Sequence, residues 1–358
     1  MKQKILLWSK EEYLYPGAGQ FIPYLMANTH EDEQVRPAMI VVPGGGFIQL
    51  CTGEAEGVAK AFYDLGYNTF VLVYTNNVTL RQPVYYQALK DASRAVRILR
   101  KCCDEFRIIS NQIHAIGFSG GGTLVASMAT RYVLPVLRDS GYYGRESNRL
   151  NTASLVYPMT RASISPGISN ILFQKEVQER LQLDQCVDRD SVPLFIMHGT
   201  EDCMVAAEEQ AMPMAVACAR NNIPYELHLL LGCDHGFIVQ EMDPMGPKSS
   251  EYLFEQLYCT INAMTDAEFA EYTDVYGDLK KGMDFCDFAR IVQKETMNKM
   301  WWKGLQVDPE QAKKAVKATT IGERRPELPA NPTAKNWWLM VDRWIKMLLL
   351  SQDSAETS

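Results

Sequence analysis

The stretch 113–129 constrains the fold more than any other part of the chain. It begins as an apolar run, crosses Gly117-Phe-Ser-Gly-Gly121, and continues as small and apolar residues at helical spacing. This order predicts a strand, a sharp turn and a helix, with Ser119 at the apex of the turn. Such a turn strains the backbone of its serine and lifts the hydroxyl above the sheet, and glycines are needed where strand and helix pass close together.

Strand-like and helix-like patterns alternate along the first two thirds of the chain. The alternation predicts an α/β fold with a mainly parallel, doubly wound sheet, because parallel strands need helical crossovers. The apolar runs read as strands are Ala38–Val42, Thr69–Tyr74, Ile113–Phe118, Ala153–Tyr157, Pro193–His198 and Tyr225–Leu231.

The helix expected over 85–106 has an apolar face and a basic face. The basic residues are Lys90, Arg94, Arg97 and Lys101. We interpret them as a solvated face without a binding role, as is usual for charged residues opposite an apolar stripe.

Three residue types that together perform nucleophilic catalysis occur in the order Ser119, Asp202 and His235. Each follows a predicted strand, and the carboxyl ends of parallel strands meet at one edge of a sheet. A serine hydroxyl is a weak nucleophile until a neighbouring imidazole takes its proton. The imidazole needs a carboxylate on its other nitrogen, which fixes the tautomer and stabilises the imidazolium. We therefore expect the three side chains to meet.

The base is chosen from five histidines. His114 and His198 lie inside predicted strands and are expected to be hydrogen-bonded core residues, and His228 is expected on a strand face. His235 lies in a glycine-flanked loop after the last of these strands, where a base can reach a serine.

The choice of acid leaves competitors. Glu201 and Asp234 are neighbours of the favoured residues in the sequence. Asp234 is adjacent to His235, so the chain makes a side-on approach to the imidazole awkward. Asp202 is therefore the preferred acid.

A glycine-rich loop follows the first buried strand. The strand 38–42 runs into Pro43-Gly-Gly-Gly-Phe47, where glycines allow a sharp turn that presents free N–H groups. The loop is either a plain turn or one half of an oxyanion hole, the role that such a loop has in esterases with an HGGG-type motif.

Composition excludes several classes of protein. The 358 residues are 47% hydrophobic and 22% charged, with a net charge of −7, which argues for a globular fold and against a broad nucleic-acid surface. The nine cysteines show no C-x-x-C spacing, so neither a zinc site nor a disulfide framework is expected. No apolar run has the length of a signal peptide or a membrane span, so we expect a cytoplasmic protein that does not bind membranes.

Four motifs together resemble the α/β-hydrolase esterases of the acetyl-xylan esterase/BD-FAE type, which are related to hormone-sensitive-lipase-like esterases. They are Pro43-Gly-Gly-Gly-Phe47, Gly117-Phe-Ser-Gly-Gly121, Gly199-Thr-Glu-Asp-Cys-Met-Val205 and Asp234-His-Gly-Phe237, and the resemblance covers roughly residues 35–240. It implies an α/β-hydrolase fold in which Ser119, Asp202 and His235 are catalytic. It also implies an oxyanion hole formed by backbone N–H groups, those of Gly45, Gly46 and Gly120.

Two positions depart from the family pattern. Pro43 stands where many relatives have histidine, although some carbohydrate esterases also begin this loop with proline. Gly120 replaces the commoner alanine, which keeps the N–H group and loosens the turn slightly. Neither departure removes a group that the expected chemistry needs.

The tail suggests three parts: a hydrolase core over 1–240, a largely helical insertion over 241–332, and a closing helix with a polar tail over 333–358. The tryptophan-rich stretch 335–349 resembles the helix that normally ends the family fold. Because the insertion leaves the fold beside His235, we expect it to border or cap the active site or to form a homo-oligomer contact. The alternative is a helical patch packed on the outside.

These features predict a serine carboxylesterase without cofactor or metal. The resemblance implies short acyl groups, acetyl on a sugar or oligosaccharide in particular. Two alternatives stay open: a peptidase or thioesterase on the same fold, and a non-catalytic hydrolase fold that serves as a small-molecule receptor. An intact set of three catalytic residues argues against the receptor, which has no need of them.

Overall fold

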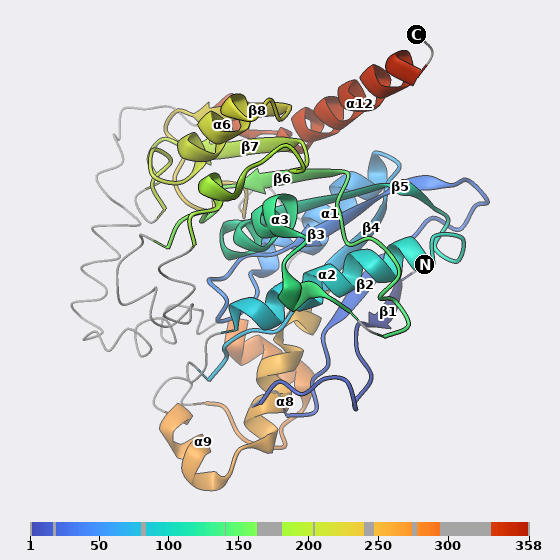
Figure 1. Cartoon of the computed structure of the whole chain (residues 1–358). Coiled ribbons are helices and arrows are strands. Elements are labelled where there is room, and N and C mark those ends of the chain that lie inside the picture. Colours follow the sequence, from blue (N-terminus) through green and yellow to red (C-terminus); the bar gives the residue numbers. More distant parts are fainter. Residues whose placement is uncertain are drawn as a thin grey trace.

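The computed structural model describes residues 2–16, 19–79, 84–139, 141–162, 181–202, 205–239, 247–273, 278–293 and 331–356. In this part of the chain an eight-stranded sheet has the order β1-β2-β4-β3-β5-β6-β7-β8 (Figure 1). Strand β2 is antiparallel to both neighbours, and the other pairs are parallel. The strands are β1 (Lys2–Leu6), β2 (Tyr24–Asn28), β3 (Arg36–Val42), β4 (Asn68–Val73), β5 (Ile108–Phe118), β6 (Thr152–Val156), β7 (Leu194–Gly199) and β8 (Tyr225–Leu230).

Helices cover both faces of this sheet. Helices α2 (Tyr85–Lys101), α3 (Ser119–Arg131) and α6 (Ala211–Arg220) lie in front of it in Figure 1, and α1 (Glu56–Asp64) lies behind. Helix α12 (Trp337–Glu356) packs beside α1, where Trp337 contacts Phe62 and Phe118 edge to face. The predicted α/β class with a mainly parallel, doubly wound sheet is confirmed.

Burial explains which runs became central strands. All residues of β4, β6 and β7 are buried, as expected for parallel strands covered by helices on both faces. Strand β1 is mostly exposed and carries Lys2 and Lys4, charges that protect a sheet edge from pairing with another chain. At the carboxyl ends of the central strands the chain continues as 43–47, 119–121 and 157–160, and these segments lie at one buried edge of the sheet.

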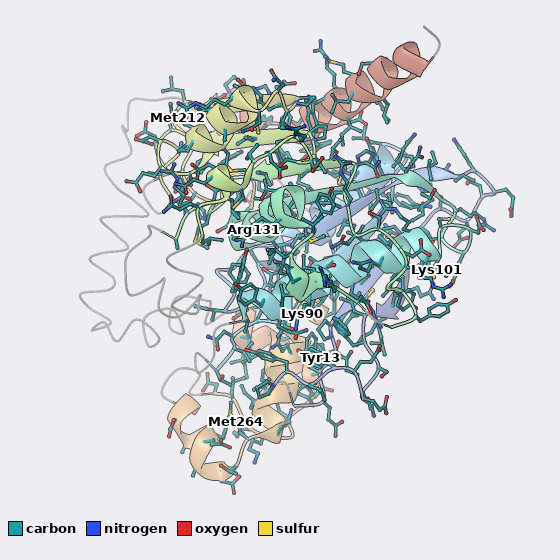
Figure 2. The ribbon with its side chains drawn as sticks, viewed as in Figure 1. Tyr13, Lys90, Lys101, Arg131, Met212 and Met264 are labelled. Atoms are coloured by element: carbon teal, nitrogen blue, oxygen red, sulfur yellow. The ribbon has the colours of Figure 1, made fainter. Side chains whose placement is uncertain are left out.

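The expectation of a solvated basic face on α2 is wrong for two of its four residues. Arg94 and Arg97 are 3% and 8% exposed. Arg94 donates hydrogen bonds to Glu12 and Asp139, and Arg97 donates to backbone carbonyls of the segment 137–146. This segment packs along α2 and covers the guanidinium groups, whereas Lys90 and Lys101 lie toward the two ends of the helix (Figure 2).

Part of the expected insertion lies within the described residues. The 3₁₀ segment η4 (Pro247–Phe254), α8 (Glu255–Ala263) and α9 (Asp266–Thr273) lie at the β1–β2 end of the sheet (Figure 1). Gln256 exchanges two hydrogen bonds of 2.7 Å with the backbone of Asn76, which follows β4. Residues 240–246, 274–277 and 294–330 lie outside the described part, so the insertion as a separate unit stays a prediction.

Replacing Trp337 tests whether α12 belongs to the core. Trp337 is 0% exposed, so Trp337→Ala should lower the free energy of unfolding by about 3–5 kcal/mol through lost burial and the cavity left behind. Leu339, on the same helix, is 46% exposed, and Leu339→Ala should cost less than about 0.5 kcal/mol. Urea denaturation of both variants measures the difference, and equal costs would contradict this packing.

Candidate active site

The turn at Ser119 has the strained geometry that the sequence predicts. Ser119 has φ +48°, in the left-handed region that only glycine adopts freely, and it is the first residue of α3. The flanking glycines are required by space. A Cβ atom on Gly117 would lie 2.4 Å from the carbonyl oxygen of Gly121, and one on Gly121 would lie 2.2 Å from that of Val42. The serine is only partly buried, so its hydroxyl is accessible at the sheet edge.

The structure brings Ser119, His235 and Asp202 into one chain of hydrogen bonds. His235 Nε2 lies 2.9 Å from Ser119 Oγ, and His235 Nδ1 lies 2.7 Å from Asp202 Oδ2. The three residues follow β5, β7 and β8, so the shared carboxyl edge of the parallel strands gathers them. With Asp202 accepting at Nδ1, the neutral imidazole presents an unprotonated Nε2 to the serine hydroxyl.

Asp202 has a second histidine beside it. His198 Nε2 lies 3.0 Å from Asp202 Oδ2 and 2.6 Å from the carbonyl oxygen of Val205. Because both neighbours are acceptors, Nε2 of His198 carries the proton. The backbone N–H of Val205 donates to Asp202 Oδ1 at 2.8 Å. The carboxylate, whose side chain is 0% exposed, is therefore held from three directions.

These contacts move the two pKa values apart. Burial raises the pKa of Asp202, but the neighbouring charge of His235 and hydrogen bonds from both histidines outweigh it, so the pKa lies well below its usual range. Burial lowers the pKa of His235, but the carboxylates of Asp202, Glu54 and Asp234 outweigh it, so the pKa lies above the ordinary value of 6.5. The arrangement thus favours an imidazolium beside an ionised carboxylate once a proton arrives.

Two glycine turns meet beside Ser119. A Cβ atom on Gly120 would lie 3.3 Å from the backbone nitrogen of Gly46, and one on Gly44 would lie 2.9 Å from the Cβ of Ser119. Gly45 and Gly46 have φ +114° and +60°, which turn the loop sharply after β3. Among the described residues, no hydrogen bond occupies the N–H of Gly46 or Gly120. These amides are free to donate to an oxygen beside the serine.

Sequence reasoning missed three side chains around this group. His198 was expected only as a hydrogen-bonded core residue, yet it supports Asp202. Glu54 and Tyr157, which adjoin the glycine loop and the His235 ring, were not singled out. Tyr157 carries one signal, its place directly after β6, whereas Glu54 lies in the turn before α1 and carries none.

The described residues form neither a candidate metal site nor a membrane-spanning helix. No group of three or more histidine, cysteine, aspartate or glutamate residues there is arranged to hold a metal ion. None of the helices described is both long and apolar enough to cross a membrane.

A titration of His235 tests the electrostatics directly. Its imidazole, followed by NMR in isotope-labelled protein, should titrate above the ordinary histidine value of 6.5, because nearby carboxylates stabilise the charged form. Asp202→Asn keeps a hydrogen-bond acceptor but removes the charge, so the midpoint should fall. Glu226→Gln, which alters the carboxylate beside His228, should leave it unchanged. An unshifted midpoint in Asp202→Asn would contradict the assignment.

Known proteins resemble this chain in sequence and in structure. The BD-FAE family model matches residues 24–153. An endo-1,4-beta-xylanase B from Butyrivibrio fibrisolvens is 32% identical over 257 residues, which are 70% of this chain and 40% of that protein. The chain therefore spans less than half the length of this relative.

Two solved structures share the fold. An acetyl ester-xyloside bifunctional hydrolase from Caldicellulosiruptor lactoaceticus superimposes with a TM-score of 0.61 at 25% identity, covering 74% of this chain and 97% of its own. A carboxylesterase from Lactobacillus plantarum WCFS1 gives a TM-score of 0.56 at 18% identity, covering 85% of this chain and 98% of its own. The resemblance found in the motifs is confirmed: this is an α/β-hydrolase fold that matches the BD-FAE family model over residues 24–153 and is similar to an acetyl ester-xyloside bifunctional hydrolase.

Proposed function

We propose that the protein is a serine carboxylesterase that hydrolyses short acyl esters, acetyl esters of carbohydrates in particular. The observation that carries the proposal is the continuous hydrogen-bonded chain from Ser119 through His235 to Asp202 beside two glycine turns. A hydroxyl bonded to an imidazole that a carboxylate orients is activated for attack on a carbonyl carbon.

In the first half of the reaction Ser119 Oγ attacks the ester carbonyl, and His235 Nε2 takes the hydroxyl proton. The carbonyl oxygen becomes an oxyanion, to which the N–H groups of Gly45, Gly46 and Gly120 donate. The N-terminus of α3 adds its positive dipole end at the same place. The tetrahedral intermediate collapses when His235 returns the proton to the departing alcohol.

In the second half water replaces the alcohol. His235 takes a proton from this water as it attacks the acyl-serine, and a second oxyanion forms on the same amides. As the bond between the acyl carbon and Ser119 Oγ breaks, His235 returns this proton to Oγ, so the carboxylic acid leaves and the hydroxyl is restored. All catalytic groups in both halves belong to this chain, and Asp202 stabilises the imidazolium of His235 in each half.

The substrate class rests on the relatives. One of them is named for acetyl-ester and xyloside hydrolysis, and another is a xylanase that extends well beyond the matched region. Both names concern xylan-type carbohydrates. An acetylated xylo-oligosaccharide is therefore the substrate to test first.

Loss of Ser119 tests the mechanism. The native protein should hydrolyse p-nitrophenyl acetate and become labelled by a fluorophosphonate, and Ser119→Ala should lose labelling and at least about 10³-fold in kcat/KM. Ser110→Ala, an exposed serine in the first half of β5, is the control and should leave both unchanged. Faster release from an acyl-CoA or an aminoacyl amide would favour a thioesterase or peptidase, and failure of the native protein to label would favour a receptor.

The acid side of the pH profile tests the role of His235. Only the neutral imidazole accepts the serine proton, so kcat/KM should fall as the pH drops through the pKa of His235. This pKa is raised by the neighbouring carboxylates, so the midpoint should lie above 6.5. A midpoint below this value, measured with p-nitrophenyl acetate in buffers of constant ionic strength, would contradict the proposed base.

A further inference from the structure

A buried carboxylate lies directly behind the glycine loop. Glu54 is 3% exposed and belongs to the 3₁₀ turn η1 (Thr52–Glu54) that precedes α1. Its Oε2 accepts a hydrogen bond of 2.7 Å from the backbone N–H of Gly44. A Cβ atom on Gly44 would lie 2.9 Å from this oxygen and 2.9 Å from the Cβ of Ser119. Only Gly44 therefore separates this carboxylate from the proposed nucleophile.

The other carboxylate oxygen connects the loop to His235. Glu54 Oε1 accepts a hydrogen bond of 2.8 Å from the hydroxyl of Tyr157, which follows β6. The Tyr157 ring lies against the His235 ring, with centroids 4.8 Å apart and an interplanar angle of 57°. The Glu54 carboxylate thus joins the glycine loop after β3 to the Tyr157 ring that packs against the imidazole of His235.

The backbone of Tyr157 is held in an unfavourable conformation for this contact. Its φ is +38°, which costs a non-glycine residue on the order of 1–3 kcal/mol. The residue is 0% exposed, and its N–H donates to the carbonyl oxygen of Met197 at 2.7 Å. Strain of this kind persists where the surrounding structure fixes the residue, and such positions cluster at functional sites.

The groups around Glu54 are donors. The N–H of Gly44, the hydroxyl of Tyr157 and the thiol of Cys51 all face the carboxylate. Burial raises the pKa of Glu54 above its usual range, and these donors together with the charge of His235 offset only part of that rise. Glu54 also acts with Asp202 and Asp234 to raise the pKa of His235.

We propose that Glu54 is a positioning residue of the catalytic site. It joins the glycine loop 43–47 to the Tyr157 ring that packs against His235, and it places a second negative charge beside this imidazole. This role rests on the proposed esterase function. The hydrogen bond that Glu54 accepts from the N–H of Gly44 fixes the loop turn, so that the N–H groups of the following glycines point toward the oxyanion. The bond from Tyr157 keeps the aromatic ring against the imidazole, and the charge favours the imidazolium that forms during attack.

The chain contains a matched control pair. Glu56 accepts a hydrogen bond of 2.7 Å from the hydroxyl of Tyr252 and pairs with Lys2 at 2.8 Å, and its side chain is 6% exposed. Glu56 lies two residues after Glu54, Tyr252 is half-buried, and within the described part of the chain none of their hydrogen bonds or ring contacts reaches Ser119 or His235. Replacing either residue alters a comparable bond outside the catalytic group.

Glu54→Gln removes the negative charge at position 54 but keeps the shape of the side chain. The amide oxygen can still accept from Gly44 and the amide nitrogen can donate to Tyr157, whose hydroxyl turns, so the fold should persist. Without the negative charge, the acid limb of kcat/KM should move to lower pH. The value of kcat should fall by about 10-fold to 10²-fold, with KM nearly unchanged. The upper bound corresponds to the loss expected when one oxyanion-hole donor is removed.

Tyr157→Phe removes the hydrogen-bonded link between the ring and Glu54 while it leaves the Glu54 carboxylate in place. It removes only the hydroxyl that joins the ring to Glu54, so kcat should fall by about 10-fold while the acid limb does not move to lower pH. The control variants Glu56→Gln and Tyr252→Phe should leave kcat and the pH profile unchanged. Thermal unfolding of all four variants identifies any loss that comes from stability alone.

The outcomes distinguish this inference from the function on which it rests. A native protein that neither hydrolyses p-nitrophenyl acetate nor reacts with a fluorophosphonate would overturn both. An active native protein whose Glu54→Gln variant matches Glu56→Gln in kcat and in pH midpoint would overturn the positioning role alone. Should Glu54→Gln fail to fold, an unchanged kcat in Tyr157→Phe would overturn the proposed link.

Discussion

The site depends on the contact between the turns that follow β3 and β5. These strands are neighbours in parallel register, with Val42 opposite Gly117, so both turns leave the sheet about 4.8 Å apart. At that spacing there is no room for a side chain between them, and a Cβ atom on Gly121 would lie 2.5 Å from the carbonyl oxygen of Pro43. The strand pairing, rather than any single loop interaction, therefore sets how close the loop amides come to Ser119.

Two buried carboxylates are connected to the same imidazole: Asp202 bonds to His235 directly, whereas Glu54 bonds to the hydroxyl of Tyr157, whose ring packs against His235. An isolated buried charge is strongly destabilising, so neither Asp202 nor Glu54 is tolerable without its hydrogen bonds. Asp202 receives them from two histidines and a backbone N–H, whereas Glu54 receives them from Gly44 and Tyr157. These donors come from β7 and from the segments that follow β3, β6, β7 and β8, so their hydrogen bonds also link these segments along the sheet edge.

The sequence alone was sufficient to predict the fold class and those candidate site residues that carry local signals. Ser119 could be found because strand, turn and helix patterns meet there, and His235 because its loop is flanked by glycine. Glu54 was not found because its partner Tyr157 is 103 residues away, and hydropathy patterns hold no information on such pairs. Arg94 was misread for the same reason, since its partner Asp139 comes from a distant segment that covers the helix.

The positive φ angles at Ser119 and Tyr157 have different consequences for the stability of this protein. Glycine adopts such conformations without cost, so at either position it would relax the native backbone even though it removes a side chain. At Ser119 the side chain lost is only partly buried, so the exchange would relieve strain at the expense of the hydroxyl. At Tyr157 the exchange would empty a fully buried site, and the lost burial of an aromatic side chain, about 3–5 kcal/mol, exceeds the strain that it relieves. Packing therefore locks the strained backbone at Tyr157, whereas at Ser119 a single exchange could release it.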